Sequence, residues 1–193
     1  MKNTELNQRL EFLRSAEHLK DTLRSGFTTL GRSESVADHT WRLTLLVITL
    51  SDLLPDLDLL RLLKICILHD LGEAVGGDIP ASSQAGSDLE SHKERNDFQS
   101  LITTLPDHLQ SEFLALWDEY ESAMSIEAQV AKALDKIETL LQHNQGKNPA
   151  NFDYSFNLTY GRQHTDAVPL ATQIRELIDE ETSANVKRAQ QDG

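Results

Sequence analysis

Apolar side chains recur every three to four residues along most of this chain, which is the spacing of one face of a helix. The first such stripe predicts an amphipathic helix from about Glu5 to Arg24, ended by Gly26. Its apolar members are Leu6, Leu10, Leu13, Ala16, Leu19 and Leu23. We expect the residues from Gly26 to Glu34 to form a loop.

Two further helices are expected before the middle of the chain. Residues 35–38, with the sequence Ser-Val-Ala-Asp, have the S-x-x-D form of a capping box, so a helix should run from Val36 to about Leu53. The run from Leu57 to Leu71 is apolar on almost every side, which is typical of a helix that is buried on most of its faces. This second helix ends at a His-Asp dipeptide.

The second half of the chain alternates between loops and helical patterns. The stretch 76–91 holds three of the nine glycines and Pro80, which predicts a long loop of the kind that forms an active-site wall. The tract 147–165 is aromatic, polar and irregular. Helices are expected over residues 88–104, 107–122, 125–144 and 166–184.

No alternating apolar and polar pattern of useful length predicts a strand, so we expect an all-α fold in the form of a compact helical bundle. Residues 1–146 should form the main domain. Residues 147–193 should add an irregular segment and a C-terminal helix that packs on the same domain. Trp41 and Trp117 both fall on apolar stripes and are expected in the core.

Composition narrows the class of protein. The chain has 193 residues, of which 39% are hydrophobic, so it is long enough for one domain with a real core. There are 18 Lys and Arg residues against 31 Asp and Glu residues, which gives a formal net charge of −13. A chain so acidic repels a phosphate backbone, and general nucleic-acid binding is therefore disfavoured.

The sequence contains no segment that predicts a membrane location. Residues 1–10 are polar, and the longest apolar stretch, Leu43 to Leu50, is far too short to cross a bilayer. We expect a cytoplasmic protein with no membrane partner. Its cysteine, Cys66, lies between two isoleucines and is expected to be a buried, inert thiol. Because the sequence has only this one cysteine, an internal disulfide and a CxxC zinc site are excluded.

A possible metal site emerges from polar residues on apolar helices. His69 and Asp70 end the most apolar helix, where a bound cation would compensate the cost of burying charge. A capping histidine beside a solvated aspartate is the alternative. His39 on a neighbouring helix and Asp135 on a late helix strengthen the metal interpretation. Two imidazoles and two carboxylates suit a divalent ion such as Mn, Co, Fe, Ni or Zn.

Four blocks of sequence extend this pattern. They are Arg-Ser-Glu-Ser-Val-Ala-Asp-His at 32–39, Leu-His-Asp-Leu-Gly-Glu at 68–73, Gly-Asp-Ile-Pro at 77–80 and Leu-Trp-Asp-Glu-Tyr-Glu at 116–121. In this order and at this spacing they resemble the HD-domain metal-dependent phosphohydrolases, and within them the 5′-deoxynucleotidase group. The resemblance runs from about Leu6 to Asn144.

The resemblance implies a homodimer that removes phosphate from (deoxy)nucleoside 5′-monophosphates, with a metal site between central helices. The ligands of that divalent cation would be His39, His69, Asp70 and Asp135. The resemblance also makes Mg a candidate for the ion. Glu73 and Asp78 would be catalytic, near the attacking water. A second ion could lie near Glu73, Asp78 and Ile79. Contacts to the nucleotide are expected from Arg24, Phe27, Arg32, Asp78 and Ile79.

Simple chemistry supports these roles independently. Water bound to a divalent ion can have its pKa lowered to about 7, which supplies a nucleophile without a serine or cysteine. Glu73 follows His69 at i+4, so its carboxylate would face the metal if the helix continues, and it could accept a proton from that water. Arg24 and Arg32 bracket the Gly26 loop, and the planar fork of an arginine suits phosphate.

Some features leave alternatives open. Related proteins carry tryptophan where this chain has Phe27, and the following stretch to His39 is about two residues shorter, so selection of the sugar is less certain than the reaction. The other interpretations are a phosphohydrolase of the same fold acting on nucleoside triphosphates or cyclic nucleotides, and a non-catalytic HD regulatory module. The remaining histidines are expected at the surface or near substrate; they are His18, His92, His108, His143 and His164.

Overall fold

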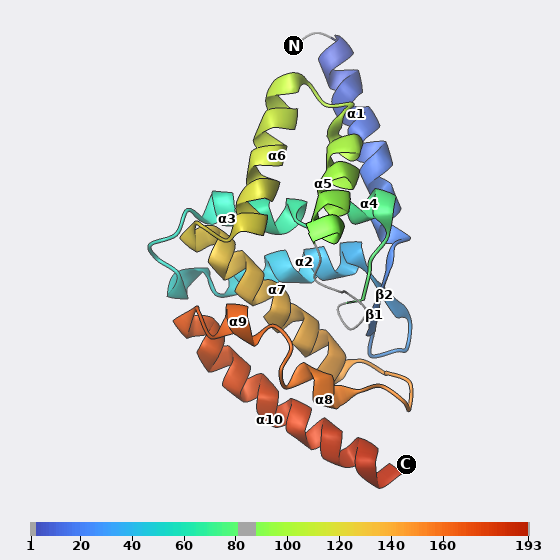
Figure 1. The fold of residues 1–193 in the computed structure, drawn as a ribbon, viewed down its shortest axis with the longest axis vertical. Coiled ribbons are helices and arrows are strands. Elements are labelled where there is room, and N and C mark those ends of the chain that lie inside the picture. Colours follow the sequence, from blue (N-terminus) through green and yellow to red (C-terminus); the bar gives the residue numbers. More distant parts are fainter. Residues whose placement is uncertain (1–2, 81–87, 193) are drawn as a thin grey trace.

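The computed structural model describes residues 3–80 and 88–192, and helices dominate them (Figure 1). The first half contains α1 (Asn3–Ala16), η1 (Glu17–Lys20), β1 (Leu23–Phe27), β2 (Ser33–Ser35), α2 (Val36–Thr49), η2 (Ser51–Leu53), α3 (Leu59–Leu68) and α4 (Glu73–Gly76). The second half contains α5 (Asp88–Ile102), α6 (Asp107–Ser122), α7 (Ile126–Gln145), α8 (Tyr154–Asn157), α9 (Arg162–Thr165) and α10 (Pro169–Asp192). The all-α prediction is confirmed. The loop predicted at 76–91 lies partly outside the described residues.

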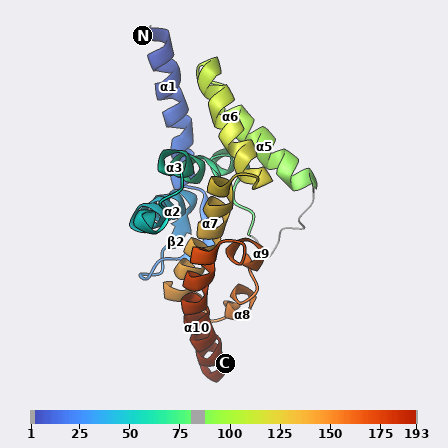
Figure 2. The ribbon, with the colours of Figure 1, turned by 90° about the vertical axis from the view of Figure 1, so that its left-hand side faces the viewer.

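The helix α7 runs through the middle of the molecule and organises the core. It packs against α2, α3, α6, α9 and α10, and Figures 1 and 2 show it between the group α1, α5, α6 and the group α8, α9, α10. Its first turn is capped by Ser125, whose hydroxyl accepts the backbone N–H of Ala128 at 3.1 Å. Twelve of its twenty residues are buried, including the charged Asp135 and Glu138. A buried charge is costly without a partner, so these residues mark α7 as a candidate location for a functional site.

The helices α2 and α3 begin at the caps that the sequence provides. The Ser35 hydroxyl accepts the Asp38 N–H at 3.1 Å, and the Asp38 carboxylate accepts the Ser35 N–H at 2.9 Å, which confirms the capping box. The Asp58 carboxylate caps α3 by accepting the Arg61 N–H at 3.0 Å. This helix ends at Leu68, and His69 is its C-cap. The prediction that it is buried on most faces is wrong, because only Leu62, Ile65, Cys66 and Leu68 are buried, whereas Leu60 and Ile67 are 65% and 46% exposed.

The start of the chain corrects two predictions. The helix expected as far as Arg24 ends at Ala16, and Leu23–Phe27 instead forms a strand that pairs antiparallel with Ser33–Ser35, where a loop was expected. Strands of five and three residues are too short to show an alternating pattern, whereas the pairing satisfies their backbone groups. The hairpin presses on α7, since a Cβ at Gly26 would lie 3.2 Å from Gln142.

The two tryptophans differ in their surroundings. Trp117 on α6 is buried at 3% exposure, as predicted, and stacks on Phe98 with 6.0 Å between ring centroids. Trp41 on α2 is 64% exposed, so its assignment to the core is wrong. The face of α2 that enters the core carries Val36, Leu43 and Val47, and Trp41 lies on a second apolar stripe that faces outward.

The C-terminal part packs along α7. The short helices α8 and α9 interrupt the tract that was expected to be irregular, and α10 extends from Pro169 to Asp192 beside them (Figure 2). Gly161, with φ of +69°, makes the turn into α9, where a Cβ would lie 2.6 Å from Lys136. The domain boundary after residue 146 stays a prediction. Within the described residues, no helix is long and apolar enough to cross a membrane.

Candidate metal centre and active site

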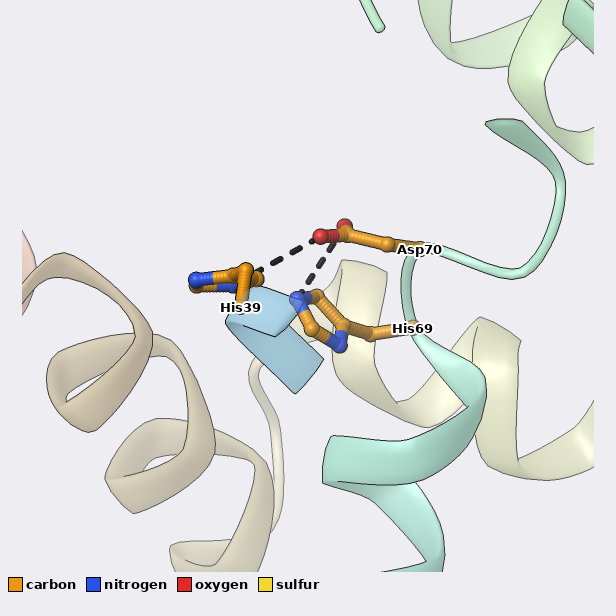
Figure 3. A group of neighbouring side chains, drawn as sticks. All are labelled: His39, His69 and Asp70. Atoms are coloured by element: carbon orange, nitrogen blue, oxygen red, sulfur yellow. Dashed lines mark ion pairs between the residues drawn. The ribbon is translucent and has the colours of Figure 1, made fainter. Parts of the chain in front are cut away.

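His39, His69 and Asp70 converge from two helices (Figure 3). His39 lies in the first turns of α2, and His69 and Asp70 lie where α3 ends. The Nε2 atom of His69 is 3.0 Å from Asp70 Oδ1, and the Nε2 atom of His39 is 3.6 Å from Asp70 Oδ2. Because α3 stops here, the carboxylate of the dipeptide can turn back toward both rings.

Asp135 completes the group from α7. Its Oδ1 atom lies 3.2 Å from His39 Nε2 and 4.0 Å from His69 Nε2. Its Oδ2 atom accepts hydrogen bonds from the Tyr120 hydroxyl at 2.9 Å and from Lys136 Nζ at 2.8 Å. One carboxylate oxygen is therefore held by protein donors, and the other faces the two imidazoles.

The far sides of both imidazole rings are fixed by acceptors. The Nδ1 atom of His69 donates to the Cys66 carbonyl at 2.9 Å, and the Nδ1 atom of His39 donates to the Glu138 carboxylate. Arg42 in turn donates from Nε to Glu138 at 2.6 Å. Acceptors on Nδ1 leave Nε2 as the nitrogen that can bind a metal, which is the usual arrangement around metal-binding histidines.

The donor set fits a divalent cation. Both Nε2 atoms are buried and make no hydrogen bond to any described atom, which is costly unless a ligand satisfies them. Burial and the charge of Arg24 lower the pKa of His39, but attraction from Glu138 and Asp135 outweighs them and raises it to about 9. A bound cation competes with that proton for Nε2. Two imidazoles with two carboxylates form a typical site for such an ion.

A second group of potential ligands surrounds the other side of His39. Glu34, His39 and Glu138 lie close enough to hold an ion. However, Glu138 is already paired with Arg42, and Glu34 Oε2 lies 3.5 Å from Arg24 Nε. Because each carboxylate is paired with an arginine, this group orients the His39 ring, and its Nε2 atom stays available to bind a metal.

Arg24 reaches the centre from β1 rather than from the helix that was predicted. Its Nη1 atom lies 3.4 Å from Asp70 Oδ2, and its Nη2 atom donates to the Thr139 hydroxyl at 3.1 Å. Burial lowers the pKa of Arg24, but attraction from Asp70 and Asp135 outweighs it and raises that pKa. The guanidinium is therefore permanently charged beside the cluster.

Glu73 and Asp78 lie at the edge of the same site. The chain turns after Leu68 and starts α4 at Glu73, so the continuous helix assumed for the i+4 argument is not present. Glu73 nevertheless faces the cavity, and its Oε2 atom is buried without a hydrogen-bond partner. Burial, with repulsion from Asp70 and Asp78, raises the pKa of Glu73 to about 10. Burial also raises the pKa of Asp78. A bound cation would counteract both effects.

A cavity of about 560 Å³ opens over these groups. Of the residues expected at the site, its lining includes Arg24, Phe27, His69, Asp70, Glu73, Asp78, Ile79 and Asp135. Arg32 is not part of the lining. It is exposed, and its Nη1 atom lies 2.7 Å from Asp38 Oδ2, so its position gives no support to the expected phosphate contact.

Several cavity residues were not expected from the sequence. Lys132, Lys136, Thr139 and His143 line the cavity from the same face of α7 as Asp135. His143 is buried, which corrects its predicted surface position, and its Nδ1 atom lies 3.0 Å from Asn157 Oδ1. The helical spacing from Asp135 was a signal that could have found Lys132, Thr139 and His143, which lie three, four and eight residues away, but not Lys136, which is adjacent in sequence. Residues 149–160 also contribute to the lining.

Comparisons with known proteins agree with this geometry. A family model described as HD domain matches residues 16–175, which begins after the start of the resemblance at Leu6 and continues past its end at Asn144. The chain is 29% identical to 5′-deoxynucleotidase HDDC2 of Xenopus laevis over 188 residues, covering 94% of this chain and 92% of that protein. It is 32% identical to the Danio rerio protein of the same name, covering 82% of each.

Solved structures share the fold. The structure of a predicted metal-dependent phosphohydrolase from Magnetospirillum magnetotacticum MS-1 superposes with a TM-score of 0.78 at 24% identity, covering 95% of this chain and 98% of the other. A conserved hypothetical protein from Pyrococcus furiosus gives a TM-score of 0.62 at 26% identity, covering 89% and 98%. Because the HD domain family model spans most of its length, this chain belongs to the HD domain family.

Proposed function

We propose that this protein is a metal-dependent phosphomonoesterase that removes the 5′-phosphate of nucleoside monophosphates, with 2′-deoxyribonucleotides as the preferred class. The observation that carries the proposal is the pair of buried Nε2 atoms without hydrogen bonds, on His39 and His69, beside the carboxylates of Asp70 and Asp135, which line a cavity. Relatives that span most of the chain are named 5′-deoxynucleotidases, which supports the same activity.

The divalent ion would be held by His39, His69, Asp70 and Asp135. When bound, it lowers the pKa of a coordinated water toward neutrality and offsets the negative charge of a phosphate. The ligand set suits Mn, Co, Fe, Ni or Zn more than Mg, because two imidazoles are softer donors than the oxygens that Mg prefers.

Glu73 is proposed as the general base. Its carboxylate lines the cavity next to Asp70 and has an oxygen free of protein donors, so it can accept a proton from the attacking water. Asp78 and Ile79 line the same cavity. We propose that Glu73, Asp78 and Ile79 could together hold a second cation during the reaction.

Arg24 is proposed to bind the phosphate. A guanidinium has five N–H donors, and those of Arg24 that contact Asp70 and Thr139 leave others for phosphate oxygens. Phe27, three residues further along β1, lines the same cavity and is proposed to lie beside the sugar. Position 27 would then influence the choice between deoxyribose and ribose.

The charge of the cavity favours monophosphates over polyphosphates. Among the described residues of its lining, seven are carboxylates and three are lysine or arginine. Lys132 and Lys136 are themselves paired with Glu121 and Asp135. A triphosphate would bring up to four negative charges into this acidic cavity, so a nucleoside triphosphatase remains the weaker alternative.

A phosphate-release screen tests the proposal. Protein stripped with EDTA is reloaded with single divalent metals and supplied with nucleoside mono-, di- and triphosphates and cyclic nucleotides. We expect release from monophosphates only, and only with metal. Release from triphosphates or cyclic nucleotides instead would favour the alternative activity, and no release from any of them would favour the non-catalytic module.

A homodimer is also proposed, as the family resemblance implies. The exposed apolar stripe of Trp41, Leu45 and Ile48 on the outer face of α2 supports it, because a contiguous apolar face of this kind commonly marks a protein contact. Light scattering after size exclusion tests it. We expect a dimer for the wild type and a monomer for Trp41→Lys, and a monomeric wild type would contradict the proposal.

A further inference from the structure

Residues 149–160 line part of the cavity, and the function proposed above assigns them no role. This segment, here called the aromatic wall, contributes Phe152, Phe156 and Tyr160 to the lining. All three rings are partly exposed. Phe156 and Tyr160 stack on each other with 5.4 Å between centroids and 29° between planes. Partly exposed rings inside a cavity cost hydrophobic free energy unless a flat or apolar ligand covers them.

The aromatic wall contacts the cavity-lining face of α7 at two places. At the first, Lys136 Nζ is 5.4 Å from the centre of the Tyr160 ring. At the second, the Phe152 ring packs edge-on against His143 at 5.0 Å. His143 is next to β1, since a Cβ at Gly26 would lie 3.7 Å from its Cδ2 atom. The aromatic rings therefore line the cavity from the metal ligand Asp135 to the strand that carries Arg24.

The backbone of the wall is fixed although it contains only one short helix, α8. Arg175 on α10 is buried, and it donates to the carbonyls of Tyr160 at 2.7 Å and Asn157 at 2.6 Å. Asp153 caps α8 by accepting the Ser155 N–H at 2.9 Å. Burying a guanidinium is costly unless its donors are paired, and here the two carbonyls pair it. The Arg175 side chain thereby fixes the backbone that carries the rings. A surface held in place before binding loses little entropy when a ligand arrives.

One polar group in the wall also lacks a partner. Asn157 is fully buried and lines the cavity, and its Oδ1 atom pairs with His143. Its Nδ2 atom makes no hydrogen bond to any described atom. An unpaired amide donor beside aromatic rings is suited to a ligand that combines a flat ring with acceptor atoms.

We propose that the aromatic wall is the nucleobase site, in which Phe156 and Phe152 contact the faces of the base while its phosphate lies at Arg24 and the metal ligands. This inference rests on the proposed function, because it takes a nucleotide as the substrate. Stacking on aromatic rings is available to every base, since each has a π face. The wall therefore adds affinity for nucleotides over base-free sugar phosphates and discriminates little among bases.

Two substrates distinguish an effect on binding of the base from an effect on phosphate release. The values of kcat/KM are measured for 2′-deoxyadenosine 5′-monophosphate and for 2-deoxyribose 5-phosphate, which carries the same phosphate without a base. We expect Phe156→Ala to lower the nucleotide value roughly 10-fold and to leave the sugar phosphate value within about twofold. Phe156→Trp should retain the nucleotide value. An equal fall for both substrates would overturn the inference, because it would assign the ring a purely structural role.

A matched control removes an aromatic ring elsewhere. Phe113 on α6 pairs with Phe12 at 5.8 Å and is not part of the cavity lining, so Phe113→Ala reports the effect of losing a ring from the fold alone. Its ratio between the two substrates should equal that of the wild type. If Phe156→Ala does not fold, Phe156→Leu keeps an apolar side chain without a π face and should show the same loss for the nucleotide only.

Equilibrium binding keeps the inference independent of the reaction. If the wild type hydrolyses neither substrate, the proposed function fails, and the wall is then judged by titration with 2′-deoxyadenosine, which carries no phosphate. We expect Phe156→Ala to weaken this binding roughly 10-fold. Equal affinities for the wild type and the variant would overturn the nucleobase site.

Discussion

On the charged side of the site, α2, α7 and the residues that follow α3 bring charged side chains into the interior, whereas on the aromatic side residues 149–160 contribute the rings of Phe152, Phe156 and Tyr160, with Asp153 and Asn157 between them. The charged side is fixed by pairs of strong contacts: His39 lies between Glu138 and Asp135, and Asp135 lies between Tyr120 and the histidines. The aromatic side is fixed by one buried arginine, Arg175.

This difference teaches where substitutions should act. Removing a charged group from the first side leaves its buried partners unsatisfied, and such losses are large and difficult to compensate. Removing a ring from the second side takes away contact area in proportion to its size. We therefore expect large effects on turnover from the charged side and graded effects on substrate binding from the aromatic side.

The largest effect should come from Asp70→Asn. This change keeps the size of the side chain but removes a charged ligand that faces both Nε2 atoms, so phosphate release should fall below detection with any divalent metal. Addition of metal should also no longer raise the melting temperature. Asp118→Asn, on α6 and outside the cavity, is the control. Full turnover by rigorously metal-free wild type would contradict the mechanism.

Glu73→Gln should have the next largest effect. The amide preserves the shape of the side chain but cannot accept the proton, so kcat should fall about 10²–10⁴-fold while bound metal stays near the wild-type amount. Steady-state kinetics and metal analysis of the same preparation measure both. Glu112→Gln, which lies on α6 and pairs with Lys64 at the surface, should change neither. An unaltered kcat would reassign Glu73 to a structural role.

Glu138→Gln should weaken metal binding without touching a ligand. The neutral amide is a poorer acceptor for His39 Nδ1 and no longer balances Arg42, so we expect the metal affinity to fall about 10–100-fold. Competition with a chelating dye measures this in the absence of substrate. The Glu112→Gln protein again serves as the comparison, and an unchanged affinity would show that His39 is held by packing alone.

The smallest effect is expected at Phe27, where the charged and aromatic sides meet β1. Phe27→Trp adds a larger ring with an N–H donor beside the proposed sugar position, so the preference for dAMP over AMP should increase. Apolar pockets reject an extra hydroxyl by about 10²-fold at most, which limits the gain. The ratio of kcat/KM values is compared for dAMP with AMP and for dCMP with CMP. Equal ratios in both proteins would show that position 27 does not set the choice of sugar, and the shortened stretch before His39 would be tested next.

The sequence was sufficient for the local parts of the fold. The caps at Ser35 and Ser125 and the stripes of α6 and α7 are contained within single helices, so neighbouring residues specify them. The charged side was also accessible, because a histidine or aspartate on an otherwise buried face is conspicuous in a sequence. His39, His69, Asp70 and Asp135 were expected together, and the structure brings them together.

Only the tertiary structure decided the remainder. The hairpin that carries Arg24 depends on pairing with a strand that begins six residues after the first strand ends and on close approach to α7, and neither leaves a pattern in the local sequence. Trp41 and His143 were misplaced because burial depends on which face of a helix meets its neighbours. The aromatic wall became part of the site only because Arg175, fifteen residues beyond Tyr160, fixes its backbone. Contacts between distant segments gain their free energy from the assembled fold, and the sequence of either segment alone does not reveal them.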